Sequence, residues 1–393
     1  MKKLMLALAA TTLMTSAALA EDIKMGVILG FTGPIESLTP AMAAGAEMAM
    51  KEVSDSGKLL DGSTVTPVRG DSTCTDSAAA TAAAERLITS DKVAAIMGAD
   101  CSGVTGAILQ NAARANGIVM ISPSATSPGL STAEDDGLFF RTAPSDARQG
   151  QVLAEVMKEN GVKSAALTYT NNDYGKGLAD SIKENFESIG GKITISAAHE
   201  DAKGDYSAEV GALAQAGGDV LIVAGYLDKG GKGIIQGALD SGAFDTFVLP
   251  DGMIGDSLPE AIGDGLNGSY GTVPGTESKG AEIFGSLFEA AGNKVGPYTG
   301  EAYDAAALMM LAMQAAKSSK SADFKGKIMD VANAPGEQIM PGELGKALEL
   351  IAAGKDIDYV GATAVELIGP GESAGSYRQI LVKDGKNTTA KYR

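Results

Sequence analysis

Polar side chains follow five short apolar runs of the sequence, and together they could bind a small zwitterion. The apolar runs end at residues 97, 121, 169, 224 and 249, and the polar candidates after them are Ser102, Ser124, Thr126, Tyr174, Tyr226 and Asp251. In a parallel α/β sheet, ligands bind beyond the carboxyl ends of the strands, where loops lead into helices. We therefore expect Ser102 and nearby free N–H groups to bind a carboxylate, and Thr126, a backbone carbonyl and Asp251 to bind an ammonium group. Each residue alone could equally be a cap or turn former, so the arrangement across five strand ends is what favours a site.

Strand and helix patterns alternate along the chain, which predicts an α/β fold with parallel sheets covered by helices on both faces. The predicted strands are 23–29, 64–69, 93–97, 118–121, 165–169, 192–197, 220–224 and 246–249. The predicted helices are 41–54, 77–88, 104–116, 176–189, 206–216, 233–241 and 302–316. A chain of 393 residues is long enough for two such domains.

We expect the chain to cross between two lobes at 140–145 and 271–275, and helix 302–316 to return to the first lobe. The predicted domains are therefore a signal peptide at 1–20, a first lobe of 21–142 plus 274–355, and a second lobe of 143–273 plus 356–393.

The first twenty residues, MKKLMLALAATTLMTSAALA, have the pattern of a secretory signal peptide. Lys2 and Lys3 form its basic region, residues 4–13 its apolar region, and residues 18–20 an A-x-A cleavage signal. No later segment has about 18 uninterrupted apolar residues, so we expect a soluble, secreted protein.

The two cysteines of the chain, Cys74 and Cys101, would then lie in an oxidising compartment, where they can pair. A disulfide between them would close a loop of about 28 residues and stabilise the fold by roughly 3–4 kcal/mol on the chain-entropy model. The alternative is two free thiols.

Composition and motifs count against several classes of function. With 32 Lys and Arg against 49 Asp and Glu, the formal net charge is −17, which argues against nucleic acid as a partner. One histidine and two cysteines make a transition-metal site or a His-dependent triad hard to build, so we expect no metal and no cofactor. The run Gly231–Gly237 matches G-x-G-x-x-G, but it begins several residues past its strand and is a weak signal. We therefore expect a protein that is not an enzyme.

An ordered series of motifs resembles the leucine/isoleucine/valine-binding family of periplasmic solute-binding proteins, which serve ABC importers. The motifs are GVILGFTGP, GDSTC, MGADCSGVTGA, MISPSATSP, FFRTAPSD, YTNNDYGKGLAD, VLIVAGY and VLPDG, and they run from about residue 23 to residue 251. The resemblance implies the type I fold of that family, with two Rossmann-like lobes joined by a three-stranded hinge and closing on a ligand. It also implies that Cys74 and Cys101 form a disulfide in the first lobe.

Matched motif by motif, the resemblance gives roles to the residues of the first lobe and to one acid of the second. Ser102 would hold the ligand carboxylate through its hydroxyl and backbone N–H. Ser124 would offer its carbonyl, and Thr126 its hydroxyl, to the ligand ammonium, with Asp251 as the counter-charge.

The remaining matches concern the walls of the pocket. Tyr174 and Tyr226 would approach the ligand from the second lobe. Leu38 stands where leucine-binding members carry an aromatic residue that packs on the ligand side chain, and Asp251 is shorter than their glutamate. The resemblance therefore implies an intact amino-acid clamp and leaves the side-chain pocket open.

These observations lead to one main hypothesis: a monomeric periplasmic protein that binds a branched-chain or other neutral amino acid and delivers it to an ABC permease in the inner membrane. One alternative keeps the transport role but replaces the ligand by a solute such as an amide or an aromatic acid. A second alternative, from another class, is a ligand-sensing receptor domain.

Overall fold

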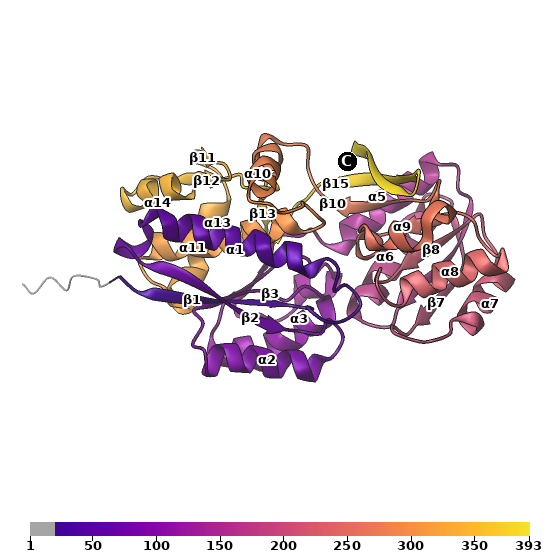
Figure 1. Cartoon of the computed structure of the whole chain (residues 1–393), viewed down its shortest axis with the longest axis horizontal. Helices are drawn as coiled ribbons and strands as arrows, with labels where there is room; N and C mark the ends of the chain where they lie inside the picture. The colour runs from indigo at the N-terminus through magenta and orange to yellow at the C-terminus, as the bar shows by residue number, and fades with distance from the viewer. Residues whose placement is uncertain (1–19) are drawn as a thin grey trace, which may run out of the picture.

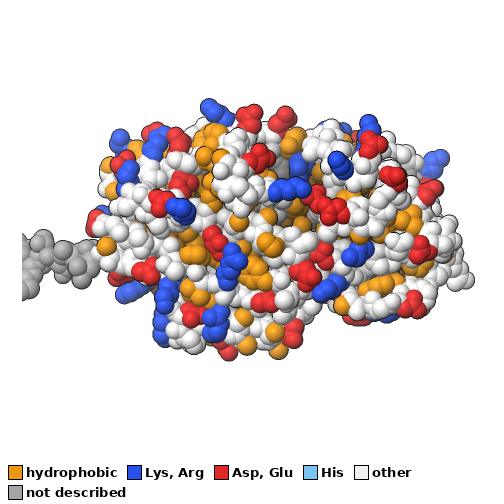
Figure 2. All heavy atoms as spheres, viewed as in Figure 1, with side chains coloured by type: hydrophobic (Ala, Val, Ile, Leu, Met, Phe, Trp, Pro, Cys, Tyr) orange, Lys and Arg blue, Asp and Glu red, His pale blue; other side chains and the backbone are white. Residues whose placement is uncertain are grey.

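The computed structural model describes residues 20–393, which form two lobes, each built on a seven-stranded sheet (Figure 1). The predicted signal peptide lies outside the described residues except for Ala20. Among residues 20–393, no helix is long and apolar enough to cross a membrane. On the face shown in Figure 2, acidic and basic side chains are interspersed over both lobes.

The first sheet has the strand order β13-β14-β5-β4-β3-β1-β2. Its strands are β1 (Asp22–Leu29), β2 (Thr64–Asp71), β3 (Ala95–Gly98), β4 (Met120–Ser122), β5 (Phe139–Arg141), β13 (Leu367–Ile368) and β14 (Glu372–Ser373). Strands β1 to β5 are parallel to one another, and only the pair β13–β14 is antiparallel. Every residue of β3, β4 and β5 is buried, as the apolar runs predicted for a sheet covered on both faces.

Helices cover both faces of this sheet. They are α1 (Thr39–Ser56), α2 (Ser77–Thr89), α3 (Ser102–Ile108), α4 (Arg114–Asn116), α10 (Lys279–Ala290), α11 (Thr299–Ala316), α12 (Ser321–Phe324), α13 (Ile328–Ala332) and α14 (Leu344–Ala352). Helix α1 packs against α11, and α2 packs against α3. The contact with α11 requires glycine at position 45, because a Cβ there would lie 2.4 Å from the carbonyl oxygen of Thr299. Close packing of α1 and α11 thus fixes the start of α11, which borders the second lobe.

The second sheet has the strand order β16-β15-β10-β9-β8-β6-β7. Its strands are β6 (Ser164–Thr170), β7 (Lys192–His199), β8 (Val220–Ala224), β9 (Phe247–Leu249), β10 (Tyr270–Pro274), β15 (Tyr377–Lys383) and β16 (Lys386–Tyr392). Its helices are α5 (Asp146–Glu159), α6 (Asp173–Ser188), α7 (Ser207–Ala216), α8 (Gly231–Ser241) and α9 (Ser257–Ile262). Strands β6 to β10 are parallel, and β15 and β16 extend the sheet in antiparallel pairing.

The chain crosses between the two sheets three times, at residues 142–145, 275–278 and 374–376. The crossings lie side by side: the N–H of Gly275 donates to the carbonyl of Ser376 at 3.0 Å, and the Ser376 hydroxyl donates to the Gly275 carbonyl at 3.1 Å. Gly375 has φ +60°, and a Cβ there would lie 2.5 Å from Cβ of Pro144, so only glycine fits. These contacts make the three-stranded connection between the lobes.

The boundary predicted at residues 355 and 356 is wrong, because most of the following residues belong to the first lobe. Strand β12 (Ile357–Tyr359) pairs with β11 (Glu337–Ile339), and β13 and β14 join the first sheet next to β5. Only β15 and β16 enter the second sheet. The reason is a non-local contact: Glu372 pairs with the buried guanidinium of Arg141 on β5, more than 200 residues away. Short strands held by such a contact leave little periodic signal in the sequence.

Candidate functional site

A small cavity lies between the lobes at the carboxyl ends of both sheets. Its volume, measured as the space open to the centre of a water molecule, is about 20 Å³. The residues that line it are Ile35, Leu38, Met42, Asp100, Cys101, Ser102, Ser124, Tyr174, Tyr226, Asp251, Gly252 and Tyr298. Every predicted site residue except Thr126 is in this lining, and their roles toward a ligand stay predictions.

The first lobe contributes hydroxyl groups on a rigid loop after β3. Ser102 is the first residue of α3, and Cys101 occupies the N-cap position. The Ser102 hydroxyl accepts a hydrogen bond from the N–H of Ser127 at 3.0 Å and keeps its own proton to donate. The Ser124 hydroxyl donates to the carbonyl of Asp100 at 3.1 Å, which ties the loops after β3 and β4 together.

The Asp100 carboxylate fixes the conformation of the loop after β3 by hydrogen bonds. It accepts hydrogen bonds from the N–H of Gly30 at 2.7 Å, the Ser72 hydroxyl at 3.0 Å and the N–H of Cys101 at 3.0 Å. Burial raises the pKa of the Asp100 carboxyl, and these hydrogen bonds oppose the rise. Asp100 has three protein donors, so its structural task is to position the residues that follow.

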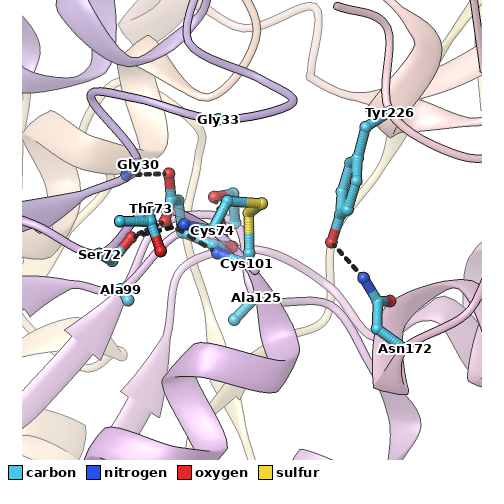
Figure 3. The surroundings of a disulfide bond; sticks show 12 residues. Gly30, Gly33, Ser72, Thr73, Cys74, Ala99, Cys101, Ala125, Asn172 and Tyr226 are labelled. Carbon is cyan, nitrogen blue, oxygen red and sulfur yellow. Dashed lines mark hydrogen bonds between the residues drawn. A yellow bond between two sulfur atoms is a disulfide. The ribbon is translucent and has the colours of Figure 1, made fainter. Parts of the chain in front are cut away.

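The disulfide implied by the family resemblance is confirmed: Cys74 and Cys101 are bonded, with their Cα atoms 5.2 Å apart. Figure 3 shows this disulfide on the first lobe, facing Tyr226 and Asn172 of the second lobe. Cys101 directly precedes Ser102, so the disulfide anchors the site loop to the loop after β2.

The second lobe contributes a buried carboxylate held by tyrosines. The Tyr174 hydroxyl donates to Oδ1 of Asp251 at 2.9 Å, and the Tyr298 hydroxyl donates to Oδ2. Burial raises the pKa of the Asp251 carboxyl, although the hydrogen bonds from Tyr298 and Tyr174 lower it. Tyr174 also stacks on Tyr226, with ring centroids 5.1 Å apart. A Cβ at position 252 would lie 2.6 Å from Oη of Tyr174. The Tyr174 hydroxyl can therefore reach Asp251 only because the residue after Asp251 is a glycine.

Tyr298 lines the cavity and binds Asp251, but the sequence analysis did not identify it. It stands at the start of α11 in the first lobe with φ +61°, yet its hydroxyl binds Asp251 of the second lobe. The predicted helix 302–316 began after Tyr298, so no expected strand end drew attention to it. The available signal in the sequence was the pair Gly296-Pro297, which marks a turn just before the helix.

Apolar side chains line one wall of the cavity. Ile35 and Leu38 come from the loop before α1, and Met42 comes from its first turn. Leu38 reaches the second lobe, because its Cδ2 lies 3.0 Å from the position that a Cβ on Gly255 would take. This wall suits the aliphatic part of a ligand.

Thr126 lies behind the cavity rather than in its lining. Its carbonyl accepts a hydrogen bond from the N–H of Asp146 at 2.8 Å, and its buried hydroxyl has no hydrogen-bond partner among residues 20–393. Asp146 is a buried acid that sequence reasoning did not single out.

Comparisons with known proteins point to one family. The family model described as "Periplasmic binding protein" matches residues 22–342 of the chain. Leu/Ile/Val-binding protein homolog 1 of Brucella abortus is 33% identical over 309 residues, which cover 77% of this chain and 80% of that protein.

Solved structures with the same fold are more distant in sequence. The branched-chain amino acid transporter substrate binding protein of Streptococcus pneumoniae, in complex with isoleucine, has a TM-score of 0.77 at 22% identity, covering 95% of this chain and 99% of that chain. A solute binding protein of an ABC transporter from Rhodopseudomonas palustris, in complex with p-hydroxybenzoic acid, has a TM-score of 0.77 at 19% identity, covering 95% of this chain and 97% of that chain. At these identities the likeness establishes the two-lobed fold alone.

Proposed function

Because the chain belongs to the family of periplasmic binding proteins, we propose that it is the solute-binding component of an ABC importer and takes a branched-chain or other neutral amino acid. The family comprises solute-binding proteins rather than enzymes. The observation that carries the choice of ligand is the cavity lining, which combines hydroxyl donors from the first lobe, a buried carboxylate from the second and an apolar wall.

Each part of the cavity suits one part of such a ligand. The Ser102 hydroxyl donates to the ligand carboxylate, and Asp251 accepts from the ammonium group. The aliphatic side chain packs on Leu38, Ile35 and Met42. Since both lobes supply contacts, the ligand favours the closed arrangement of the lobes over the open one.

The same proposal names the compartment and the partner. The protein works in the periplasm as a monomer, after removal of residues 1–20, and its closed form docks on a permease in the inner membrane. It delivers the ligand there when the lobes separate.

A second candidate ligand is a solute without an ammonium group, such as an aromatic acid. The observation that favours it is the cluster of tyrosine hydroxyls at Tyr174, Tyr226 and Tyr298, together with the structural neighbour that holds p-hydroxybenzoic acid. Against it, an uncharged or anionic group would leave the buried Asp251 without a cation.

A thermal-shift screen tests the proposal. The mature protein is unfolded and refolded to remove bound ligand, then mixed with the common amino acids, short amides, aromatic acids and polyamines. A ligand at 100 times its Kd adds about 2.7 kcal/mol to the free energy of unfolding, which raises the melting temperature by a few degrees. Shifts with leucine, isoleucine or valine support the proposal, whereas shifts confined to solutes without an α-ammonium group overturn the choice of ligand.

A further inference from the structure

Four buried side-chain oxygen atoms beside Asp251 have no hydrogen-bond partner among residues 20–393. They are Oγ1 of Thr126, both carboxylate oxygens of Asp146 and Oε1 of Gln149. The exposed fractions of these residues are 2% for Thr126, 0% for Asp146 and 1% for Gln149. Buried oxygen atoms normally take part in hydrogen bonds. In this group only the Thr126 hydroxyl carries a proton to donate, and it lies near the Asp146 carboxylate, so most of the acceptor capacity has no donor.

The backbone fixes these acceptors next to the ligand cavity. Asp146 is the first residue of α5, directly after the first crossing, and its N–H donates to the Thr126 carbonyl. Gln149 lies one turn later on the same helix, and its amide nitrogen donates to the carbonyl of Thr272 at 3.1 Å. Burial and then the neighbouring charge of Asp251 raise the pKa of the Asp146 carboxyl. Burial also raises the pKa of Asp251, and a hydrogen bond from Gln149 is among the contacts that lower it, so these side chains share one buried region.

The nearest cation of the protein is already engaged elsewhere. Arg141 lowers the pKa of Asp146, but its five N–H donors all bind other groups: the carbonyls of Ala125 and Ser127, the Ser131 hydroxyl and the Glu372 carboxylate. Tyr174 and Tyr298 direct their hydroxyls to Asp251 instead of Asp146. Asp146 thus has no paired cation among residues 20–393, and its one nearby side-chain donor is the Thr126 hydroxyl, which lowers the pKa of the Asp146 carboxyl.

We propose that the ammonium group of the ligand lies between Asp251 and Asp146, so that Asp146 is a second carboxylate that recognises the amine. The inference rests on the proposed function and sharpens its ligand class to solutes with a primary cationic amine. An ammonium group has three N–H donors, which can reach Asp251, Asp146 and one neutral oxygen of Thr126 or Gln149. Acids that lack the amine would leave these acceptors unpaired.

The charge balance gives this arrangement a measurable consequence. The charged or titratable groups that face Asp146 are Asp251, Arg141, Tyr174, Tyr298 and Tyr377. Two adjacent buried carboxylates without a free cation repel each other, which favours a shared proton on the pair in the empty protein. The ligand ammonium replaces that proton, which passes to the buffer, so each binding event releases up to one proton.

The test compares Asp146→Asn with Glu155→Gln, a neutral substitution of an exposed acid on the same helix. Leucine, isoleucine and valine are titrated by calorimetry in buffers of different ionisation enthalpy, and so is the 2-hydroxy acid that corresponds to leucine. We expect Asp146→Asn to weaken amino-acid binding about tenfold or more and to abolish proton release. Its affinity for the hydroxy acid and the melting temperature of the empty protein should not fall.

Several results would overturn the inference. Unchanged amino-acid affinity and proton release in Asp146→Asn would mean that Asp146 does not meet the amine. An equal loss for the amino acid and the hydroxy acid, with a lower melting temperature, would mean that Asp146 has only a structural role. A wild-type protein that binds only the hydroxy acid would refute the proposed ligand class itself, and that outcome is visible before any variant is made.

Discussion

The contact between the lobes at Asp228 yields a prediction whose size follows from its geometry. Oδ2 of Asp228 in the second lobe accepts a hydrogen bond from the N–H of Ser37 in the first lobe at 2.9 Å, and the Ser257 hydroxyl supports the other oxygen at 2.6 Å. The N–H of Asp228 donates to the Pro34 carbonyl at 3.0 Å, and this bond survives any side-chain change. Asp228→Ala therefore removes one charge-assisted hydrogen bond across the cleft. Since Asp228 is half-buried, its contribution is about 1 kcal/mol, at the low end for bonds to charged groups.

The lost bond exists only when the lobes are together, so the cost should appear in ligand binding and not in the stability of each lobe. A cost of about 1 kcal/mol weakens affinity about fivefold, and most of the change should be a faster dissociation rate. Titration calorimetry and stopped-flow measurements with leucine check both values. Asp228→Asn keeps an acceptor oxygen and should lose less, while Asp245→Ala, an exposed acid of the same lobe, should change neither value. Equal affinity and dissociation rate in Asp228→Ala and the wild type would refute the idea that this contact helps to hold the lobes closed.

Three further predictions concern other parts of the molecule. Replacing Cys74 and Cys101 by alanine opens a loop with a sequence separation of 27 and should cost about 3–4 kcal/mol, visible as a lower melting temperature in calorimetry; an unchanged value would contradict the chain-entropy reasoning. Burial raises the pKa of Glu301 from 4.5 to about 8. The folded protein therefore favours the protonated carboxyl, whose contribution to stability is complete below pH 4.5 and is lost as the pH rises through 8. This contribution is at most about 5 kcal/mol. Glu301→Gln should flatten the decrease of the unfolding free energy between pH 5 and 8 in urea titrations, and an equally steep decrease would count against this assignment. Asp251→Ala should abolish leucine binding in the thermal-shift assay, because the ligand ammonium loses a buried counter-charge, and normal binding would rule out that role.

Much of the site could be predicted because parallel strands deliver their carboxyl ends to a common edge. Ser102 and Ser124 follow β3 and β4, while Tyr226 and Asp251 follow β8 and β9, and each strand was visible as a short apolar run. When the carboxyl ends of two such sheets lie opposite each other, the residues that follow their strands come together between the lobes. The lining of the cavity therefore depends mainly on local patterns and one topological rule.

The residues that were missed depend on contacts between distant parts of the chain. Tyr298 reaches Asp251 because α11 is fixed against α1 at Gly45, which no local pattern around residue 298 reveals. Strands β13 and β14 join the first sheet through the pairing of Glu372 with Arg141, so the predicted boundary at residue 355 failed for the same reason. Local periodicity identifies elements, whereas their neighbours across the lobes follow from packing and buried charge.

Thr126 and Asp146 connect the proposed ligand site to the first crossing between the lobes. The sequence interpretation treated Thr126 as a ligand contact and residues 140–145 as a crossing, as two separate features. In the structure the Thr126 carbonyl binds the N–H of Asp146, the first helical residue after that crossing. A ligand group that binds Asp146 thus contacts the junction between the lobes, while Asp251 is held by tyrosines from both lobes, Tyr174 and Tyr298. If the proposed binding mode is correct, substitution of Asp146 or Asp251 should change both the affinity for the amino acid and the rate at which the lobes close on it, so both quantities are to be measured for each variant.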